Sequence, residues 1–116
     1  MKPAGKDLRA NFYYSLAPGE WKLVGTDAYD LVPEGHVGLV CSRSGLALRG
    51  VIVLNAPGIV DEDYRGEIKV ILMNVGKDTY LVEEGERIAQ LVITPCIPWD
   101  LAGERGAGGF GSTGRI

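Results

Sequence analysis

Residues 66–74 read GEIKVILMN, and this stretch decides the fold class of the chain. Ile68, Val70 and Leu72 occupy alternate positions, with the charged Lys69 between the first two. A period of two places alternate side chains on one face of an extended segment, whereas a helix needs a period of about 3.6. The stretch therefore predicts a β-strand that buries one face.

Other segments carry the same signature on both sides of this strand. Further strands are expected within EWKLVGTDAYDLV (20–32), HVGLVCS (36–42), GVIVLNA (50–56) and TYLVEEGERIAQLVITP (79–95), the last as two short strands around Glu84-Gly85. Pro57-Gly58 is predicted to make a tight turn between the strands at 51–54 and 68–73. Only GERIAQLVI competes as a helix, and its β-branched end favours a strand. Short strands at this spacing indicate an all-β sandwich or barrel.

The chain has 116 residues, which is the length of a single domain. Its composition shifts at about Gly103, where a glycine-rich tail begins. Five of the twelve residues at 105–116 are glycine, and such a segment buries too little apolar surface to hold itself folded. We therefore expect a β domain at 1–104 and a flexible tail at 105–116.

Composition also excludes several classes of protein. A net charge of −3 argues against a general nucleic-acid-binding surface, and no apolar window is long enough to span a membrane. The first residues lack the apolar core of a signal peptide, so we expect a soluble, cytoplasmic protein. Cys41 and Cys96 lie in apolar runs and are expected to be buried free thiols, and the lone His36 is expected to face solvent.

Polar side chains interrupt the apolar pattern first within CSRSGLALRG (41–50). Arg43 offers charged donors, Ser44 a hydroxyl, and Gly45 close backbone approach, which together suit an anion. In isolation, a polar surface turn explains these residues better than a binding site does.

A second polar stretch is LNAPGIVDEDYRGEI (54–68), between two expected strands. Asp61 is one of several acidic side chains there, and a carboxylate held on a rigid turn can act as a general base towards water. A solvated acidic turn is an equally good explanation. Further along, Gln90 interrupts an apolar strand and either bonds to backbone in the core or faces a polar site.

The tail itself carries polar groups that a plain linker does not need. Arg105 and Arg115 bracket GAGGFGSTG, in which glycine N–H groups, Ser112 and Thr113 can donate to an anion. Phe110 is a lone aromatic that could stack on a base. This combination suits a phosphate chain with a base nearby, although the spacing is not that of a Walker loop.

Five motifs, in this order, resemble those of the trimeric dUTP pyrophosphatase (dUTPase) family. They are AGKDL (4–8), RSGLA (43–47), NAPGIVDEDYRGEI (55–68), GERIAQL (85–91) and RGAGGFGSTG (105–114). One glycine-rich match would be weak, whereas five ordered matches are specific. Three features depart from the family: Lys6 and Ser42 replace residue types more usual there, and the short stretch before the first motif leads us to expect a missing edge strand.

The resemblance implies a jelly-roll-like β-clip subunit that forms a homotrimer, with each active site shared between subunits. It implies hydrolysis of dUTP to dUMP and pyrophosphate, which keeps uracil out of DNA and supplies dUMP for dTMP synthesis. The last motif would reach a neighbouring subunit's site and close over bound nucleotide as a lid.

By the same resemblance, Asp61 is the general base that activates water at the α-phosphorus. Asn55 and the backbone near Gly58 meet uracil, and Tyr64 packs against the deoxyribose. The remaining substrate contacts are Arg43, Ser44, Gly45 and Gln90 from the β domain, and Arg105, Phe110, Gly111, Ser112 and Thr113 from the tail, with Phe110 stacked over uracil. Mg²⁺ would bridge the phosphates and touch Asp7 and Gln90 through water, which explains the lack of a metal-ligand cluster in the sequence.

Two rival functions remain open at this point. A dCTP deaminase of the same fold would need a Glu where Ile71 stands, and tends to have Ser in place of Gly45. A non-catalytic regulatory protein that binds nucleotide would show degenerate motifs, whereas every chemical position is filled here.

Overall fold

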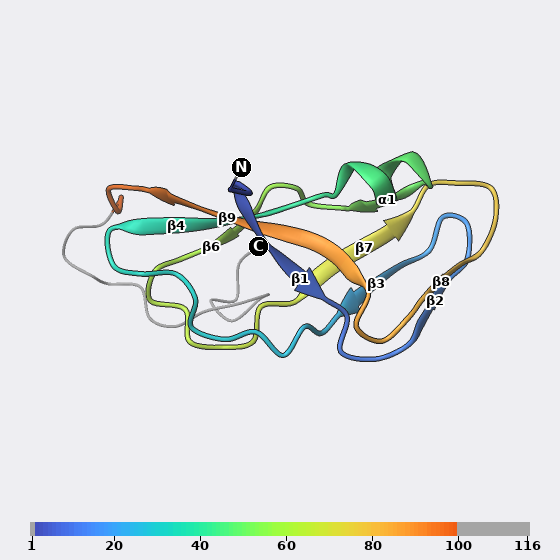
Figure 1. Ribbon diagram of the computed structural model, residues 1–116, viewed down its shortest axis with the longest axis horizontal. Coiled ribbons are helices and arrows are strands. Elements are labelled where there is room, and N and C mark those ends of the chain that lie inside the picture. The colour runs from blue at the N-terminus through green and yellow to red at the C-terminus, as the bar shows by residue number, and fades with distance from the viewer. Residues whose placement is uncertain (1, 100–116) are drawn as a thin grey trace.

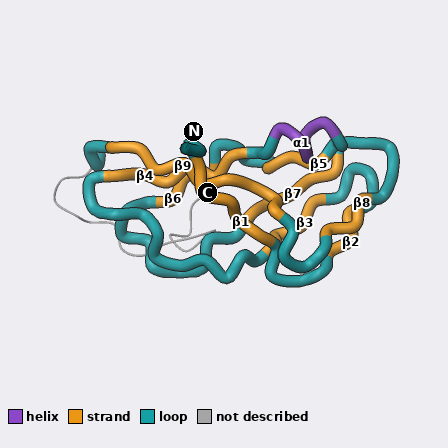
Figure 2. Tube along the Cα trace, viewed as in Figure 1, coloured by secondary structure: helices purple, strands orange, loops and turns teal. Residues whose placement is uncertain are grey.

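The computed structural model describes residues 2–99 (Figure 1). Its elements are β1 (Gly5–Arg9), β2 (Tyr14–Leu16), β3 (Trp21–Val24), β4 (His36–Cys41), α1 (Ser44–Leu48), β5 (Val51–Val53), β6 (Gly58–Val60), β7 (Val70–Asn74), β8 (Tyr80–Val82) and β9 (Arg87–Pro95). Strands and loops make up nearly all of this part of the chain, and its one helix has five residues (Figure 2). The prediction of an all-β fold is confirmed.

The strands form three antiparallel sheets. A four-stranded sheet has the order β1-β9-β4-β6, a three-stranded sheet the order β3-β7-β5, and β2 pairs with β8. In these sheets no strand pairs with its neighbour in chain order, because the chain passes repeatedly from one sheet to another. The four-stranded sheet lies towards one end of the molecule and β2, β3 and β8 towards the other (Figure 1). Such crossed connectivity is that of a jelly-roll-like fold.

The alternating stretch at 66–74 supplies the centre of the core. Ile68, Val70 and Leu72 have exposed fractions of 2%, 1% and 0%, so their shared face is fully buried. Leu8 of β1 and Leu91 of β9 belong to the same buried cluster. One contiguous apolar core therefore connects the three-stranded and four-stranded sheets.

The tight turn predicted at Pro57-Gly58 is wrong. β5 does pair with β7, but the chain between them forms β6, which pairs with β4 in the other sheet. Gly58 lies opposite Val40, and a Cβ on Gly58 would be only 3.3 Å from Val40 Cβ. Gly58 therefore lets β6 pack closely against β4, and the Ala56–Pro57 peptide bond that precedes it is cis.

Two local expectations also need correction. Residues after Arg43 form the short helix α1 with Leu46 buried, in place of the polar surface turn that their pattern favours. Cys96 is exposed and Cys41 half-buried, so the expectation of buried thiols is wrong for Cys96, although both are free. His36 is half-buried at the start of β4, where its Nδ1 lies 2.8 Å from the Glu34 carbonyl oxygen.

Across residues 2–99, the structure contains no helix with the length and apolar character needed to cross a membrane.

Candidate active site

Strand register brings the first and fourth motifs together. Asp7 of β1 lies opposite Gln90 of β9, and Gln90 lies opposite Cys41 of β4. Residues directly opposite one another in a sheet project to the same face. A carboxylate and an amide that are 83 positions apart in the sequence are thus adjacent on one face of the four-stranded sheet.

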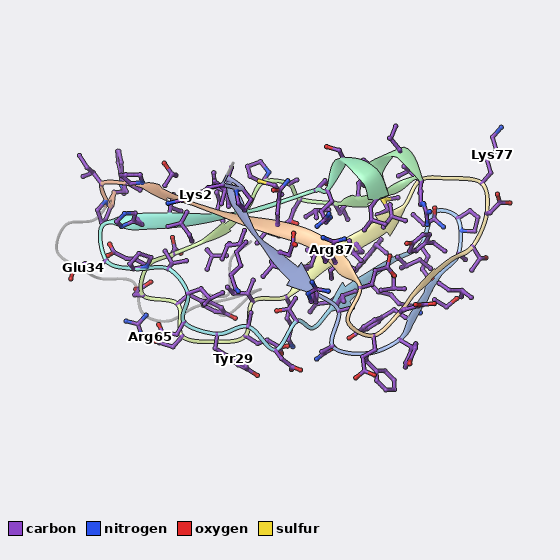
Figure 3. The ribbon with its side chains drawn as sticks, in the orientation of Figure 1. Lys2, Tyr29, Glu34, Arg65, Lys77 and Arg87 are labelled. Atoms are coloured by element: carbon purple, nitrogen blue, oxygen red, sulfur yellow. The ribbon has the colours of Figure 1, made fainter. Side chains whose placement is uncertain are left out.

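The second motif joins them through Arg43, which follows β4. Arg43 Nη1 lies 2.6 Å from Asp7 Oδ1, in a charge-assisted hydrogen bond. Arg87, which lies beside the end of β1 (Figure 3), places its Nη1 3.8 Å from Asp7 Oδ2. Two guanidinium groups therefore converge on one carboxylate, which gives this corner of an acidic protein the local positive charge that an anion needs.

The Gln90 side chain is held from two sides. Its Nε2 donates to the Ser42 carbonyl oxygen over 3.2 Å, and its Oε1 faces Gly5, where an added Cβ would be only 2.8 Å away. Ser42 in turn accepts a hydrogen bond from Val53 N–H through its hydroxyl oxygen. Both explanations offered for Gln90 therefore apply, because it bonds to backbone and also lies beside a charged cluster.

Ser44 and Gly45 lie next to this cluster at the start of α1, and both are exposed. A Cβ added at Gly45 would meet no atom within 4 Å in residues 2–99, so the space above it is open. These residues thus form one group, which we call the phosphate-side cluster. Its members are Asp7, Arg43, Ser44, Gly45 and Gln90.

A second group of predicted site residues lies at the β6 edge, and we call it the base-side cluster. Its members are Asn55, Gly58, Asp61 and Tyr64. The amide nitrogen of Asn55 would lie 3.3 Å from a Cβ on Gly58, so its side chain covers this glycine. Asp61 is half-buried directly after β6, and its carbonyl oxygen accepts from Tyr64 N–H. Tyr64 packs against the core and donates its hydroxyl to the Glu67 carbonyl oxygen over 2.8 Å.

The two clusters are far apart within one chain. Gly38 pairs with Val60, so Asp61 lies at about the level of Val37, four residues along β4 from the level of Asp7. Three strand spacings also separate β1 from β6 in the sheet order. At about 3.3 Å per residue and 4.8 Å per strand, the Cα atoms of Asp7 and Asp61 are roughly 20 Å apart. One chain alone therefore does not bring the two clusters into contact.

The loop after Asp61 is anchored to residues 26–35. Arg65 Nη1 donates to Asp30 Oδ1 over 2.9 Å, and the Glu62 carboxylate accepts from Gly35 N–H over 2.8 Å. Arg65 and Glu34 lie at the same end of the molecule in Figure 3. An open pocket of about 960 Å³ lies between these loops and the end of β9, and Asp61 is on its wall. The sequence pattern alone does not reveal these anchors, because only tertiary contact distinguishes them from solvated charges.

Several predicted residues lie outside the described part of the chain. They are the tail residues Arg105, Phe110, Gly111, Ser112 and Thr113. Within residues 2–99, the structure contains no group of three or more His, Cys, Asp or Glu side chains placed to hold a metal ion. The tail contacts stay predictions.

Comparison with known proteins decides the family. The family model described as dUTPase matches residues 1–114, which include all five motifs. The chain belongs to the dUTPase family.

Curated dUTPase relatives cover almost the whole chain. A deoxyuridine 5'-triphosphate nucleotidohydrolase of Anaeromyxobacter sp. is 52% identical over 120 residues, which span 97% of this chain and 82% of the relative. A protein of the same name from Rhizobium etli is 50% identical over 123 residues, spanning 96% and 79%.

Solved dUTPase structures share the fold. The dUTPase from phage phi11 of S. aureus superimposes with a TM-score of 0.77 at 27% identity, over 85% of this chain and 80% of that one. The native EIAV dUTPase gives a TM-score of 0.75 at 34% identity, over 86% of each chain. The jelly-roll-like subunit expected from the motifs is therefore confirmed.

Proposed function

We propose that this protein hydrolyses dUTP to dUMP and pyrophosphate, with Asp61 as the general base. The observation that carries the proposal is one cationic corner built from three different motifs: strand register pairs Asp7 with Gln90, and an ion pair joins Arg43 to Asp7. Family membership and the names of the relatives support the reaction. A phage 80alpha dUTPase mutant has been solved with dUpNHpp, which supports a uracil triphosphate as the ligand of this fold.

The phosphate-side cluster binds the triphosphate. Arg43 supplies charged donors, and Ser44 and Gly45 allow the backbone to approach a phosphate closely. A triphosphate carries about four negative charges, so the guanidinium groups offset charge that builds up on the leaving pyrophosphate.

The base-side cluster binds the nucleoside and activates the water. The backbone near Gly58 and the Asn55 amide present hydrogen-bonding groups to the uracil edge. Tyr64 lies against the deoxyribose, and its ring leaves no room for a 2′-hydroxyl. The Asp61 carboxylate takes a proton from the water that attacks the α-phosphorus, and the bond to the pyrophosphate oxygen breaks.

Mg²⁺ is the proposed cofactor, and the residues present suit it. Asp7 and Gln90 place a carboxylate and an amide side by side, and Mg²⁺ favours oxygen donors while keeping several waters. We propose that both residues contact hydrated Mg²⁺ held mainly by substrate phosphates. When bound, the ion would neutralise phosphate charge. A related structure, a mutant of the phage phi11 dUTPase, describes a structural Mg(II) ion.

The distance between the clusters supports a shared active site. Asp7 and Asp61 are roughly 20 Å apart in one chain, which favours a site where the phosphate-side cluster of one subunit meets the base-side cluster of another. We propose a homotrimer with three such sites, each closed by residues 105–116 of a neighbouring subunit. Phe110 would stack on uracil, and Arg105, Gly111, Ser112 and Thr113 would bind from the same lid.

A nucleotide panel tests the reaction directly. Purified protein with Mg²⁺ should release pyrophosphate from dUTP far faster than from dTTP, dCTP or UTP. Absence of pyrophosphate release from dUTP would overturn the proposed function, and ammonia release from dCTP would indicate a deaminase instead.

Subunit mixing tests the shared site. Arg43→Ala and Asp61→Asn variants should each be inactive as pure trimers, yet trimers reassembled from both should regain activity, because some sites then combine two intact clusters. A mixture of Asp61→Asn with Asp61→Ala is the matched control and should stay inactive. Light scattering should give three times the subunit mass.

A further inference from the structure

Tyr64 lies directly over Gly66. A Cβ added at Gly66 would be 2.6 Å from the Tyr64 hydroxyl oxygen and 2.8 Å from the ring carbon that bears it. Atoms at such distances overlap, so any side chain at position 66 must displace the ring or the backbone. The contact explains why the chain has glycine here.

Steric contact, and not backbone conformation, makes this glycine necessary. The glycines with positive φ are Gly19, Gly35, Gly50 and Gly85 in the described chain, and Gly66 is not among them. Alanine can therefore adopt the backbone conformation of Gly66, and its methyl group acts on Tyr64. The backbone of the turn can stay in place while the ring moves.

Glu67 fixes the other end of Tyr64. The Glu67 carbonyl oxygen accepts the Tyr64 hydroxyl over 2.8 Å, which holds the ring down over Gly66. The Glu67 carboxylate accepts N–H bonds from Thr26 at 3.0 Å and Asp27 at 2.9 Å. An isolated β-bridge between Tyr29 and Glu67 adds a further link. The residue that holds Tyr64 is thus attached to a segment 40 positions earlier in the sequence.

These contacts leave Tyr64 with few alternative positions. One side of its ring packs against the core, its hydroxyl is bonded, and Gly66 lies beneath it. A side chain that is fixed in this way can exclude a small group from its neighbourhood, whereas a mobile one would move aside.

We propose that Gly66 and Glu67 are positioning residues that determine the selection of deoxyribose over ribose, by holding the Tyr64 ring where a 2′-hydroxyl would collide with it. This inference rests on the proposed function, because it takes Tyr64 as the sugar contact. It assigns sugar selectivity to two residues that do not themselves touch the substrate.

The test compares dUTP with UTP. In Gly66→Ala, the ratio of kcat/KM for dUTP to that for UTP should fall at least tenfold, with kcat/KM for dUTP reduced and that for UTP raised. The ratio of Kd values for dUpNHpp and its ribose counterpart UpNHpp, measured by calorimetry, should fall by a similar factor. A purely structural role would lower activity on both nucleotides together and leave both ratios unchanged.

Gly38→Ala is the matched control. A Cβ there would be 2.8 Å from Val32 Cγ2, which is a comparable overlap. Its three nearest atoms belong to Val32, Leu91 and Val60, none of which takes part in the bond between Tyr64 and Glu67. Gly38→Ala should therefore reduce stability while keeping the dUTP-to-UTP ratio within about twofold of the wild type.

A second pair of variants, at Glu67, tests the same inference if Gly66→Ala does not fold. Glu67→Ala should lower both ratios, and Glu67→Gln should restore them, because an amide oxygen can still accept from Thr26 and Asp27 N–H. Unchanged ratios in a folded Gly66→Ala protein, or in Glu67→Ala, would overturn the inference. Failure of the wild type to hydrolyse dUTP would instead overturn the proposed function, so the two failures are distinguishable.

Discussion

Arg43 and Asp7 form an ion pair with 2.6 Å between Nη1 and Oδ1, although 36 positions separate them in the sequence. Their side chains are 28% and 38% exposed, and partly exposed pairs of this kind contribute only about 0–1 kcal/mol to stability. The main consequence of the pair is therefore geometric: it holds the Arg43 guanidinium beside Gln90, on the face proposed to bind phosphate.

Removing the Asp7 charge should affect catalysis much more than folding. In Asp7→Asn, the unfolding free energy should change by less than about 1 kcal/mol, while kcat/KM for dUTP falls at least tenfold because Arg43 loses its anchor. The Mg²⁺ concentration for half-maximal activity should rise as well. Lys22→Met is the control, since it removes another partly exposed ion pair, with Glu20, at a residue of β3 in the separate three-stranded sheet. Equal kinetic effects from the two variants would contradict the assignment.

Loss of the proposed general base should separate binding from turnover. Asp61→Asn keeps the size of the side chain but removes the proton acceptor, so kcat should fall by about 10²–10⁴. The Kd for dUpNHpp should stay within about threefold of the wild type. Asp63→Asn, two residues further on, is the neighbouring control and should retain most of the activity. A near-normal rate in Asp61→Asn would show that another group accepts the proton.

Deletion of the tail should impair closure of the active site without affecting folding of the β domain. Deletion of residues 105–116 should lower kcat/KM for dUTP at least a hundredfold, because Phe110 and Arg105 are lost, and should leave Tm within a few degrees of the wild type. Thermal melting and light scattering on the truncated protein check both expectations. Loss of the trimer or a collapse in Tm would show that the tail is structural.

The sequence predicts those strands whose own alternation of apolar residues is enough to identify them. The alternation of Ile68, Val70 and Leu72 needed no tertiary information, and the structure buries all three. β6 escaped prediction because Gly58 and Ile59 follow a Pro and have no long alternating run, so only pairing with β4 makes this segment a strand. α1 escaped because five residues are too few for a helical period to show.

The candidate site was predicted residue by residue but not as an arrangement. The motifs identified Asp7, Arg43, Gln90 and Asp61, since these residue types carry recognisable chemistry. Their grouping into two distant clusters depends on the register of β1, β9, β4 and β6, which the core fixes through tertiary packing. Gly66 appeared only as one letter of a motif, because its overlap with the Tyr64 ring exists only in three dimensions.

Asn74 provides a prediction about stability alone. It is the one buried polar residue in residues 2–99, with Nδ2 donating to the carbonyl oxygens of Leu16 and Asp78, and Oδ1 accepting from Gly76 N–H. Asn74→Ala would leave these backbone groups unpaired, and the unfolding free energy should fall by about 2–4 kcal/mol. Urea unfolding measures the change, and the exposed neighbour variant Thr79→Ala should shift it by less than about 0.5 kcal/mol. Similar changes in unfolding free energy for the two variants would contradict this role of the Asn74 hydrogen bonds.

Tyr80 should make part of the stability depend on alkaline pH. Burial raises the pKa of its hydroxyl, and so does the hydrogen bond that the hydroxyl donates to the Glu86 carboxylate, while Arg49 acts in the opposite direction. A pKa that is higher in the folded than in the unfolded chain means that the folded state binds more protons. The resulting stabilisation is therefore complete below the unfolded value of about 10 and is lost as pH rises through the folded pKa.

Tyr80→Phe isolates this contribution to stability. At pH 8 the variant should be less stable than the wild type by about 1 kcal/mol, because the bond to Glu86 is lost. Since phenylalanine does not titrate, the difference in unfolding free energy between the two proteins should shrink as pH rises from 8 towards 11. The other tyrosines and the lysines titrate in both proteins and cancel in the comparison. Urea unfolding at a series of pH values measures the difference, and a gap that stays constant or widens with pH would show that the Tyr80 proton is not held by the fold.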